Sequence, residues 1–362
     1  MLHSMSITLL LLLLLVFACM MMLSAENLPQ SAAMEVASLR ATAHNKLRRR
    51  RQQQQQQQQQ QRGLIVIPGV GRADRLLTLS ASLRLLEDEY LSPTLRPHPQ
   101  WDCIVYIYAM ANETSFWAMK AELAYISSLC RTVEHTNRRV TENLYMVQPA
   151  LIRHSYSHVF VLLDDCKLLP DPASEPPSFN LNRILGLMRH NNLTIASPRV
   201  IGANVGGGQE FRTIMQARAA PGTEGYTSVF VEWFAWVMTA HAYQALWELL
   251  CPFVNPYGWG YDFWYDNYAR TRVAGHKMGI ISTVEVKHEQ DVNAPGQGRT
   301  DNTKVETKWQ SVLKQEVHYK AHLGIDLRQI RQRLELKNTS WNGAVTGYLH
   351  KPPRQKRNTY LY

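Results

Sequence analysis

The 362-residue chain is 45% hydrophobic and 19% charged. This composition permits a large core and excludes a globally disordered protein. The net charge of +10 is concentrated in two terminal stretches. They are formed by Lys46, Arg48, Arg49, Arg50, Arg51 and Arg62, and by Lys351, Arg354, Lys356 and Arg357. Because the rest of the chain is balanced, we expect no nucleic-acid-binding surface on the folded part.

The first residues predict a membrane segment. After a short flank, 1–6, the stretch 7–23 is apolar apart from Thr8, and about 17 residues is the shortest length that spans a bilayer as a helix. We predict an anchor. The alternative is a cleaved signal, because Ser24 and Ala25 could close a peptidase site and the flank has no Lys or Arg to hold it in the cytosol.

Residues 24–62 predict a disordered stem, because the basic run and the polyglutamine tract Gln52 to Gln61 offer little to bury. Three glycosylation sequons, at Asn112, Asn192 and Asn338, favour a luminal domain. Arg48 to Arg51 would favour the opposite orientation, but they lie beyond the roughly 15–20 residues within which charge steers topology. We therefore expect a single-pass type II glycoprotein of the Golgi or another secretory membrane.

Strand and helix patterns alternate between residues 63 and 295. Strands are predicted at 63–68, 103–108, 158–163, 193–196, 228–238 and 279–286, and helices at 73–89, 115–130, 146–156, 240–250 and 262–272. The alternation predicts one α/β domain with a mainly parallel sheet and helices on both faces. A helical extension is expected at 296–350, with a helix at 305–322, and a basic disordered tail at 351–362.

Four cysteines lie within the predicted domain, Cys103, Cys130, Cys166 and Cys251, while Cys19 lies in the apolar segment. In an oxidising lumen the four could form up to two disulfides, and three pairings are possible. Buried free thiols are the alternative.

Asp164 and Asp165 follow the apolar strand 158–163, which places them at the edge where open α/β sheets bind ligands. Carboxylate oxygens suit Mg²⁺ or Mn²⁺. Such an ion could hold the diphosphate of a nucleotide sugar and stabilise the leaving group. The alternative is that the two acids only cap the turn after the strand.

His288 lies two residues beyond the strand 279–286 and could reach the same edge. We predict it as a further metal ligand, the alternative being a surface or hydrogen-bonded histidine.

The segment 258–262, Gly-Trp-Gly-Tyr-Asp, combines flexible backbone, aromatic faces and a carboxylate. Trp259 is predicted to bind a sugar ring and Asp262 to act as general base. Alternatively, the aromatic side chains belong to the core and Asp262 is the N-cap of the next helix. Glu232, within an apolar run, is a further candidate for substrate binding, together with Asp164.

Four motifs together resemble a known family: Phe160 to Asp165, Phe230 to Ala235, Gly258 to Asp262 and Val284 to His288. The family is a plant and algal group of membrane-anchored proteins with a domain of unknown function, itself similar to GT-A glycosyltransferases. The resemblance implies a GT-A-like nucleotide-diphospho-sugar transferase fold of Rossmann type. It also implies that Asp165 and His288 hold the metal and that Trp259 and Asp262 serve the acceptor. Leu163 departs from the pattern, because an acid would begin the Asp-x-Asp triplet there.

The leading hypothesis is a metal-dependent glycosyltransferase that uses a nucleotide-sugar donor and a glycan or other hydroxyl acceptor. One alternative is a catalytically degenerate glycan-binding or scaffold protein of the same fold, which Leu163 would suit. The other is a metal-dependent phosphoesterase that uses the same acids.

Overall fold

The computed structural model describes residues 62–91, 101–108, 113–134, 138–172, 174–175, 177–202, 215–218, 220–258, 260–289, 302–324 and 345–350. The chain separates into two units, Met1–Gln58 and Gln59–Tyr362, and every described residue belongs to the second. The predicted anchor, stem and basic tail thus lie outside the described residues, except Arg62. Among the described helices, none combines the length and apolar character needed to cross a membrane.

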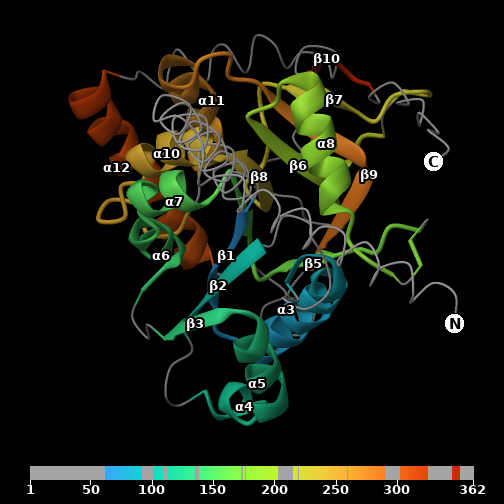
Figure 1. Cartoon of the computed structure of the whole chain (residues 1–362). Helices are drawn as coiled ribbons and strands as arrows, with labels where there is room; N and C mark the ends of the chain where they lie inside the picture. Colours follow the sequence, from blue (N-terminus) through green and yellow to red (C-terminus); the bar gives the residue numbers. More distant parts are fainter. Residues whose placement is uncertain are drawn as a thin grey trace, which may run out of the picture. The chain divides into compact units, whose positions relative to one another are not determined.

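The described part of the chain alternates strands and helices from residue 63 onward (Figure 1). The strands are β1 (Gly63–Val70), β2 (Trp101–Ile107), β3 (Arg131–Glu134), β4 (His158–Leu162), β5 (Cys166–Leu168), β6 (Ile195–Ile201), β7 (Gly225–Ser228), β8 (Ala235–Thr239), β9 (Met278–His288) and β10 (Val345–Leu349). The helices are α3 (Ala73–Leu86), the π-helix η2 (Glu87–Leu91), α4 (Thr114–Trp117), α5 (Lys120–Leu129), α6 (Val140–Met146), α7 (Pro149–Ser155), α8 (Leu181–Asn191), α10 (Ala240–Leu249), α11 (Tyr261–Arg272) and α12 (Asn302–Leu323).

All ten strands form one mixed sheet in the order β10-β7-β9-β6-β8-β4-β1-β2-β3, and β5 pairs with β9. The neighbours β3, β2, β1 and β4 are parallel, as are β6 and β9. β8 is antiparallel to both β4 and β6. The strand direction reverses from β4 to β8 and again from β8 to β6. As a result β1, β2, β4, β6 and β9 run in the same direction and all end at the same edge of the sheet.

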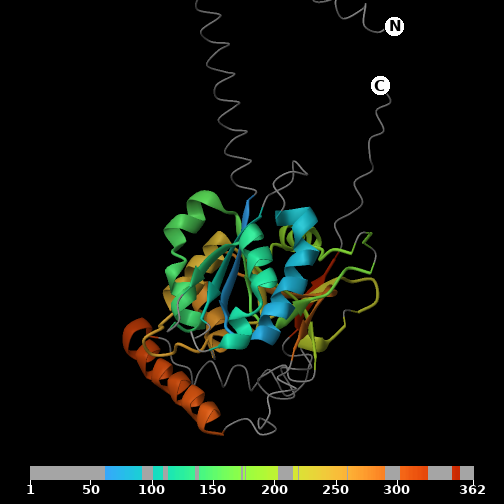
Figure 2. The ribbon, with the colours of Figure 1, turned by 90° about the horizontal axis from the view of Figure 1, so that it is seen from below.

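Helices cover both faces of the sheet (Figure 2). Figure 2 shows α3, α5 and α8 on one face and α6, α7, α10 and α11 on the other. The central strands β1, β4 and β8 are buried nearly throughout, and all eight residues of β1 are buried. Burial on both faces is typical of parallel strands in α/β proteins. The predicted α/β class is therefore confirmed, with antiparallel strands added on the side of the sheet that contains β9.

The strand predicted at 228–238 is wrong in its middle. β7 ends at Ser228 and β8 begins at Ala235, and the connection between them contains Glu232 outside any strand, followed by a turn at Trp233 and Phe234. Its backbone is held locally, because Ser228 Oγ donates to Phe230 O at 2.6 Å and Trp236 Nε1 donates to Glu232 O at 2.8 Å. Since this connection is buried, its apolar composition has the appearance of a continuous strand.

Cys103 and Cys130 form a disulfide that joins β2 to the residue between α5 and β3. Cys166 and Cys251 are buried free thiols. Of the pairings that the sequence left open, the structure therefore contains the one between Cys103 and Cys130. Disulfides of this kind form in oxidising compartments. Of the sequons, Asn192 is exposed at the end of α8, with a left-handed φ of 54°. Asn112 and Asn338 lie outside the described residues.

Candidate functional site

Asp164 and Asp165 lie where the strand order of the sheet reverses. From β1 the chain proceeds to β2 and β3 on one side and then crosses to β4 on the other side. In open α/β sheets, ligands bind at the carboxyl ends of the strands beside such a switch point. Because the two acids follow β4 after a single residue, Leu163, they stand at this position.

The three-residue strand β5 brings His288 to the two acids. β5 begins immediately after Asp165 and pairs antiparallel with the end of β9, so Cys166 lies opposite His288. A backbone hydrogen bond of 2.7 Å, in which Glu289 N donates to Asp165 O, extends this pairing. In this register His288 Nε2 lies 3.1 Å from Asp165 Oδ2. The predicted proximity is observed, while the role of the pair as metal ligands stays a prediction.

Burial and the neighbouring charges shift the pKa values of the two carboxyl groups in opposite directions. Burial, followed by the charge of Asp165, raises the pKa of Asp164 to about 8. The Oδ2 atom of Asp164 is buried and has no hydrogen-bond partner among the described residues. Burial also opposes ionisation of Asp165, but its contacts with His288 and Arg75 outweigh burial and lower its pKa. The pKa values of the two adjacent carboxyl groups are therefore shifted in opposite directions, that of Asp164 upward and that of Asp165 downward.

The geometry of the Asp165–His288 pair fits an octahedral cation. Two ligands at about 2.1 Å from one ion and at right angles lie about 3.0 Å apart, and the observed separation of the two atoms is 3.1 Å. Among the described residues, no group of three or more His, Cys, Asp or Glu side chains could hold a metal. Any Mg²⁺-type ion here would take its remaining ligands from phosphate and water, as is usual for Mg²⁺.

Leu163 stands where the resemblance would place an acid. Its side chain packs against the hydrophobic core, and its N–H donates to Phe234 O at 3.0 Å. Leu163 is thus a partly buried apolar residue beside the core, and Asp164 and Asp165 are the acids that follow it.

Arg75 is a site residue that sequence reasoning missed. It lies in the first turn of α3, is 8% exposed, and donates from Nη1 to Glu289 O at 2.9 Å. Its charge acts on both aspartates by lowering their pKa values. The signal that could have found it is its place in the first helical turn after a strand and a glycine-containing turn.

Tyr108 was also missed. It directly follows β2, and its ring packs on the end of β1 and the residue after it, where a Cβ on Gly69 or Gly71 would lie 2.8 Å or 2.4 Å from the ring. Burial, and then the charges of Asp164 and Asp165, raise the pKa of its hydroxyl. Tyr108 is therefore a neutral hydrogen-bond donor beside the two acids, and its position at a strand end could have identified it.

The connection that contains Glu232 lies between His288 and the Gly258–Asp262 segment. The Phe234 ring lies 4.4 Å from the His288 ring, centroid to centroid. The neighbouring Trp233 ring lies 5.2 Å from that of Tyr261. Glu232, within this connection, is 8% exposed.

Asp262 lies in the first turn of α11 and is half-buried. The N-cap of this helix is Gly260, with φ 86°, so the alternative role of Asp262 as N-cap does not apply. An acidic residue in a first turn is favoured by the helix dipole. Trp259 lies outside the described residues.

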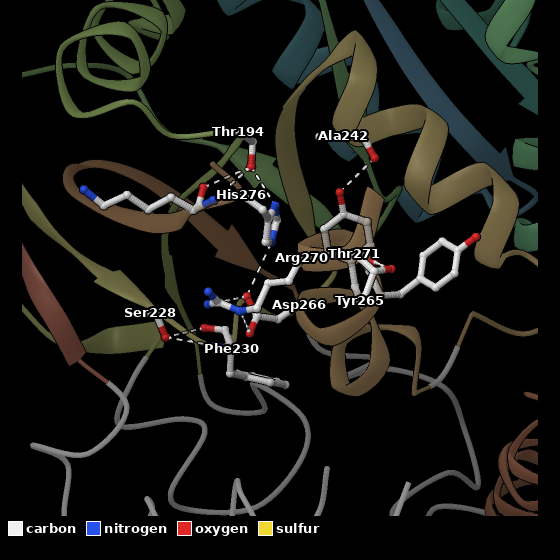
Figure 3. A network of polar contacts seen from close by, with 11 residues as sticks. Thr194, Ser228, Phe230, Ala242, Tyr265, Asp266, Arg270, Thr271 and His276 are labelled. Carbon is white, nitrogen blue, oxygen red and sulfur yellow. Dashed lines mark hydrogen bonds and ion pairs between the residues drawn. The ribbon is translucent and has the colours of Figure 1, made fainter. Parts of the chain in front are cut away.

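A second acid–histidine pair lies at the opposite end of β9 (Figure 3). His276 Nε2 is 3.4 Å from Asp266 Oδ1, and its Nδ1 is 2.8 Å from Thr194 Oγ1. Arg270 donates twice to Asp266, at 2.8 and 2.9 Å. These contacts join α11 to the residues that precede β6 and β9. Because the guanidinium compensates the buried carboxylate, we interpret this pair as structural.

No known protein-family model matches the sequence, and no curated protein matches it. Among solved structures, the chain is similar to the crystal structure of GalNAc-T7 with UDP, GalNAc and Mn²⁺. The identity is 10% and the TM-score 0.45, and the match covers 78% of this chain and 55% of that one. The chain thus spans about half the length of that relative.

The chain is also similar to UDP-glucose pyrophosphorylase, both with UDP-glucose and in the apo form. For the complex the identity is 12% and the TM-score 0.33, with 73% of this chain and 100% of that chain covered. For the apo form the identity is 10% and the TM-score 0.32, with 72% of this chain and 99% of that chain covered.

Proposed function

We propose that this domain transfers a sugar from a nucleoside-diphosphate sugar to a hydroxyl acceptor, with a divalent cation held by Asp165 and His288. The observation that carries the proposal is the 3.1 Å approach of these two side chains at the switch point of the sheet. Membership of the resembled family, the Golgi location and the membrane anchor are parts of the same proposal. They rest on the sequence motifs and the apolar amino-terminal segment.

The cation, Mn²⁺ or Mg²⁺, would supply positive charge to the diphosphate as it leaves the sugar. Asp165 suits this role because its carboxylate is held ionised. Asp164 suits a different one, since its neutral carboxyl group can donate a hydrogen bond to a donor hydroxyl. Tyr108, as a second neutral donor beside the acids, is suited to the nucleoside side of the donor.

The acceptor would be bound at the Gly258–Asp262 segment. Asp262 is proposed to accept the proton of the attacking hydroxyl group, and Trp259 to stack on the acceptor sugar. Glu232 is proposed to contact substrate from the connection between β7 and β8. The carboxylate of Asp262 belongs to a rigid helix rather than to a loop, and this favours accurate placement of a general base.

The test uses the purified domain with a panel of nucleotide sugars, Mn²⁺ and a set of glycan acceptors. We expect turnover of at least one donor, abolished by chelator. Asp262→Asn should lower kcat by about 100-fold or more without weakening nucleoside-diphosphate binding. Glu113→Gln is the matched control, because Glu113 is exposed and lies at the start of α4, outside the candidate site. Failure of every donor to bind or turn over would overturn the proposal.

A second candidate is a non-catalytic glycan-binding protein of the same fold. It is favoured by the core position of Leu163 and by the absence of a three-residue metal cluster from the described residues. This candidate predicts glycan binding that is unchanged by chelator and no turnover of any nucleotide sugar.

A further inference from the structure

The loop that leads into Asp262 is attached to the C-terminal helix α12. Asn255, at the centre of this loop, is completely buried. Its Nδ2 donates to Gln315 Oε1 at 2.7 Å, and its Oδ1 accepts from Tyr257 N at 3.2 Å. The side chain of Asn255 therefore connects the backbone of its own loop to a helix that begins about 40 residues beyond Asp262.

Gln315 continues the connection along α12. Its side chain is fully buried, and its Nε2 donates to the Tyr319 hydroxyl at 2.7 Å. That hydroxyl donates in turn to Leu249 O, at the end of α10. Each donor and acceptor of this buried chain thus has a specific partner. Removal of one member would leave its neighbours unsatisfied, at a cost of about 1–3 kcal/mol for each buried group.

The opposite side of the loop is held by α6. Thr141 Oγ1 donates to Asn255 O at 2.8 Å, and Thr141 N donates to Pro256 O at 3.3 Å. Asn143, two residues further on the same helix, donates from Nδ2 to Pro68 O in β1 at 2.8 Å. The loop is therefore held between α6 and α12, and its supports extend to the carboxyl end of the first strand.

α12 also packs directly on the turn before Asp262. Gly258 and Gly260 have φ values of 83° and 86°, and a Cβ on Gly260 would lie 3.2 Å from two methyl carbons of Val312. One helical turn into α11, the ring of Trp264 meets that of Tyr319 edge-on at 5.4 Å. Polar and apolar contacts thus support the same short segment from the same helix.

We propose that α12 is a positioning element for the general base, acting through Gln315 and Tyr319 on the loop that precedes Asp262. This inference rests on the proposed function, because it assigns the helix to the acceptor side of that same site. Its physical reason is that catalytic groups need placement to within about 0.5 Å, and that a 1 Å error can cost about 100-fold in rate. Gln315 and Tyr319 are positioning residues and do not touch the substrate.

The test compares Gln315→Ala with Val317→Ala in the complete protein. Val317 belongs to the same helix but is 70% exposed, so it controls for changes in α12 itself. The first measurement is hydrogen exchange of the backbone amides of residues 250–262. We expect faster exchange there in Gln315→Ala and wild-type exchange in Val317→Ala.

The second measurement separates positioning from general loss of structure. In Gln315→Ala, kcat for transfer should fall about 10-fold or more, while the affinity for the nucleoside diphosphate with Mn²⁺ stays unchanged. Because Asn255 and Gln315 act as one unit, adding Asn255→Ala should cause little further loss. Unchanged exchange at 250–262, or equal losses of kcat and nucleotide affinity, would overturn the positioning role.

The two proposals can fail separately. If the wild-type protein turns over no nucleotide sugar, the proposed function fails, and hydrogen exchange alone still decides whether α12 supports the loop. If the wild-type protein is active and Gln315→Ala is equally active, the positioning role fails and the proposed function stands.

Discussion

His288 Nε2 lies 3.1 Å from Asp165 Oδ2 although 123 residues separate the two in the sequence. If they share a cation, Asp165→Asn and His288→Gln should each weaken Mn²⁺-dependent nucleoside-diphosphate binding by about 100-fold, since a metal supplies several kcal/mol at a charged ligand. Calorimetry with and without chelator measures this. Metal-dependent binding that survives both substitutions would rule out the shared ion.

Gly260 is expected to be more sensitive to substitution than Gly222. Both have left-handed φ values, 86° and 80°, but only at Gly260 would a Cβ meet nearby atoms, at 3.2 Å from Val312. Gly222→Ala should cost about 1–2 kcal/mol through the left-handed conformation alone, and Gly260→Ala should cost more. Urea unfolding of the two variants provides the comparison, and equal losses would contradict the close packing of α12 on this turn.

His158, at the start of β4, predicts a loss of stability on acidification. Burial, and then the charge of Arg189, lower its pKa from 6.5 to about 4. Between these pH values the unfolded chain binds a proton that the folded chain does not, so the free energy of unfolding decreases as the pH falls. The contribution is complete above about pH 6.5 and amounts to about 3 kcal/mol at most.

Unfolding measured from pH 7 to pH 4 tests this prediction. His158→Gln should flatten the pH dependence, whereas His190→Gln, which changes an exposed residue of α8, should leave it intact. An unaltered slope in His158→Gln would show that other groups cause the acid sensitivity.

The disulfide between Cys103 and Cys130 closes a segment of 27 residues. A loop of this length predicts a stabilisation of about 3 kcal/mol. Cys103→Ser, Cys130→Ser and the double variant should therefore be destabilised equally, and reductant should affect only the wild-type protein. Denaturation with and without reductant measures the difference, and a wild-type protein indifferent to reductant would argue against the bond.

The sequence by itself determined the α/β class and the approximate positions of several strands. The strand before Asp164 and the strand near His288 were predictable because apolar runs reveal buried strands, although β9 extends to His288 itself, two residues beyond the predicted end. The helix from Ala240 was predicted to within one residue of its observed end. These features depend on local periodicity, which neighbouring residues encode.

Only the tertiary structure decided which distant segments meet. β5 has three residues, too few for a sequence pattern, yet its pairing with β9 places His288 beside Asp165. The partner of Cys103, the connection that contains Glu232, and the contact between Asn255 and Gln315 were equally inaccessible. Each of these features depends on the free energy of packing the whole chain, to which many weak contacts between remote segments contribute. A local sequence pattern does not contain this information.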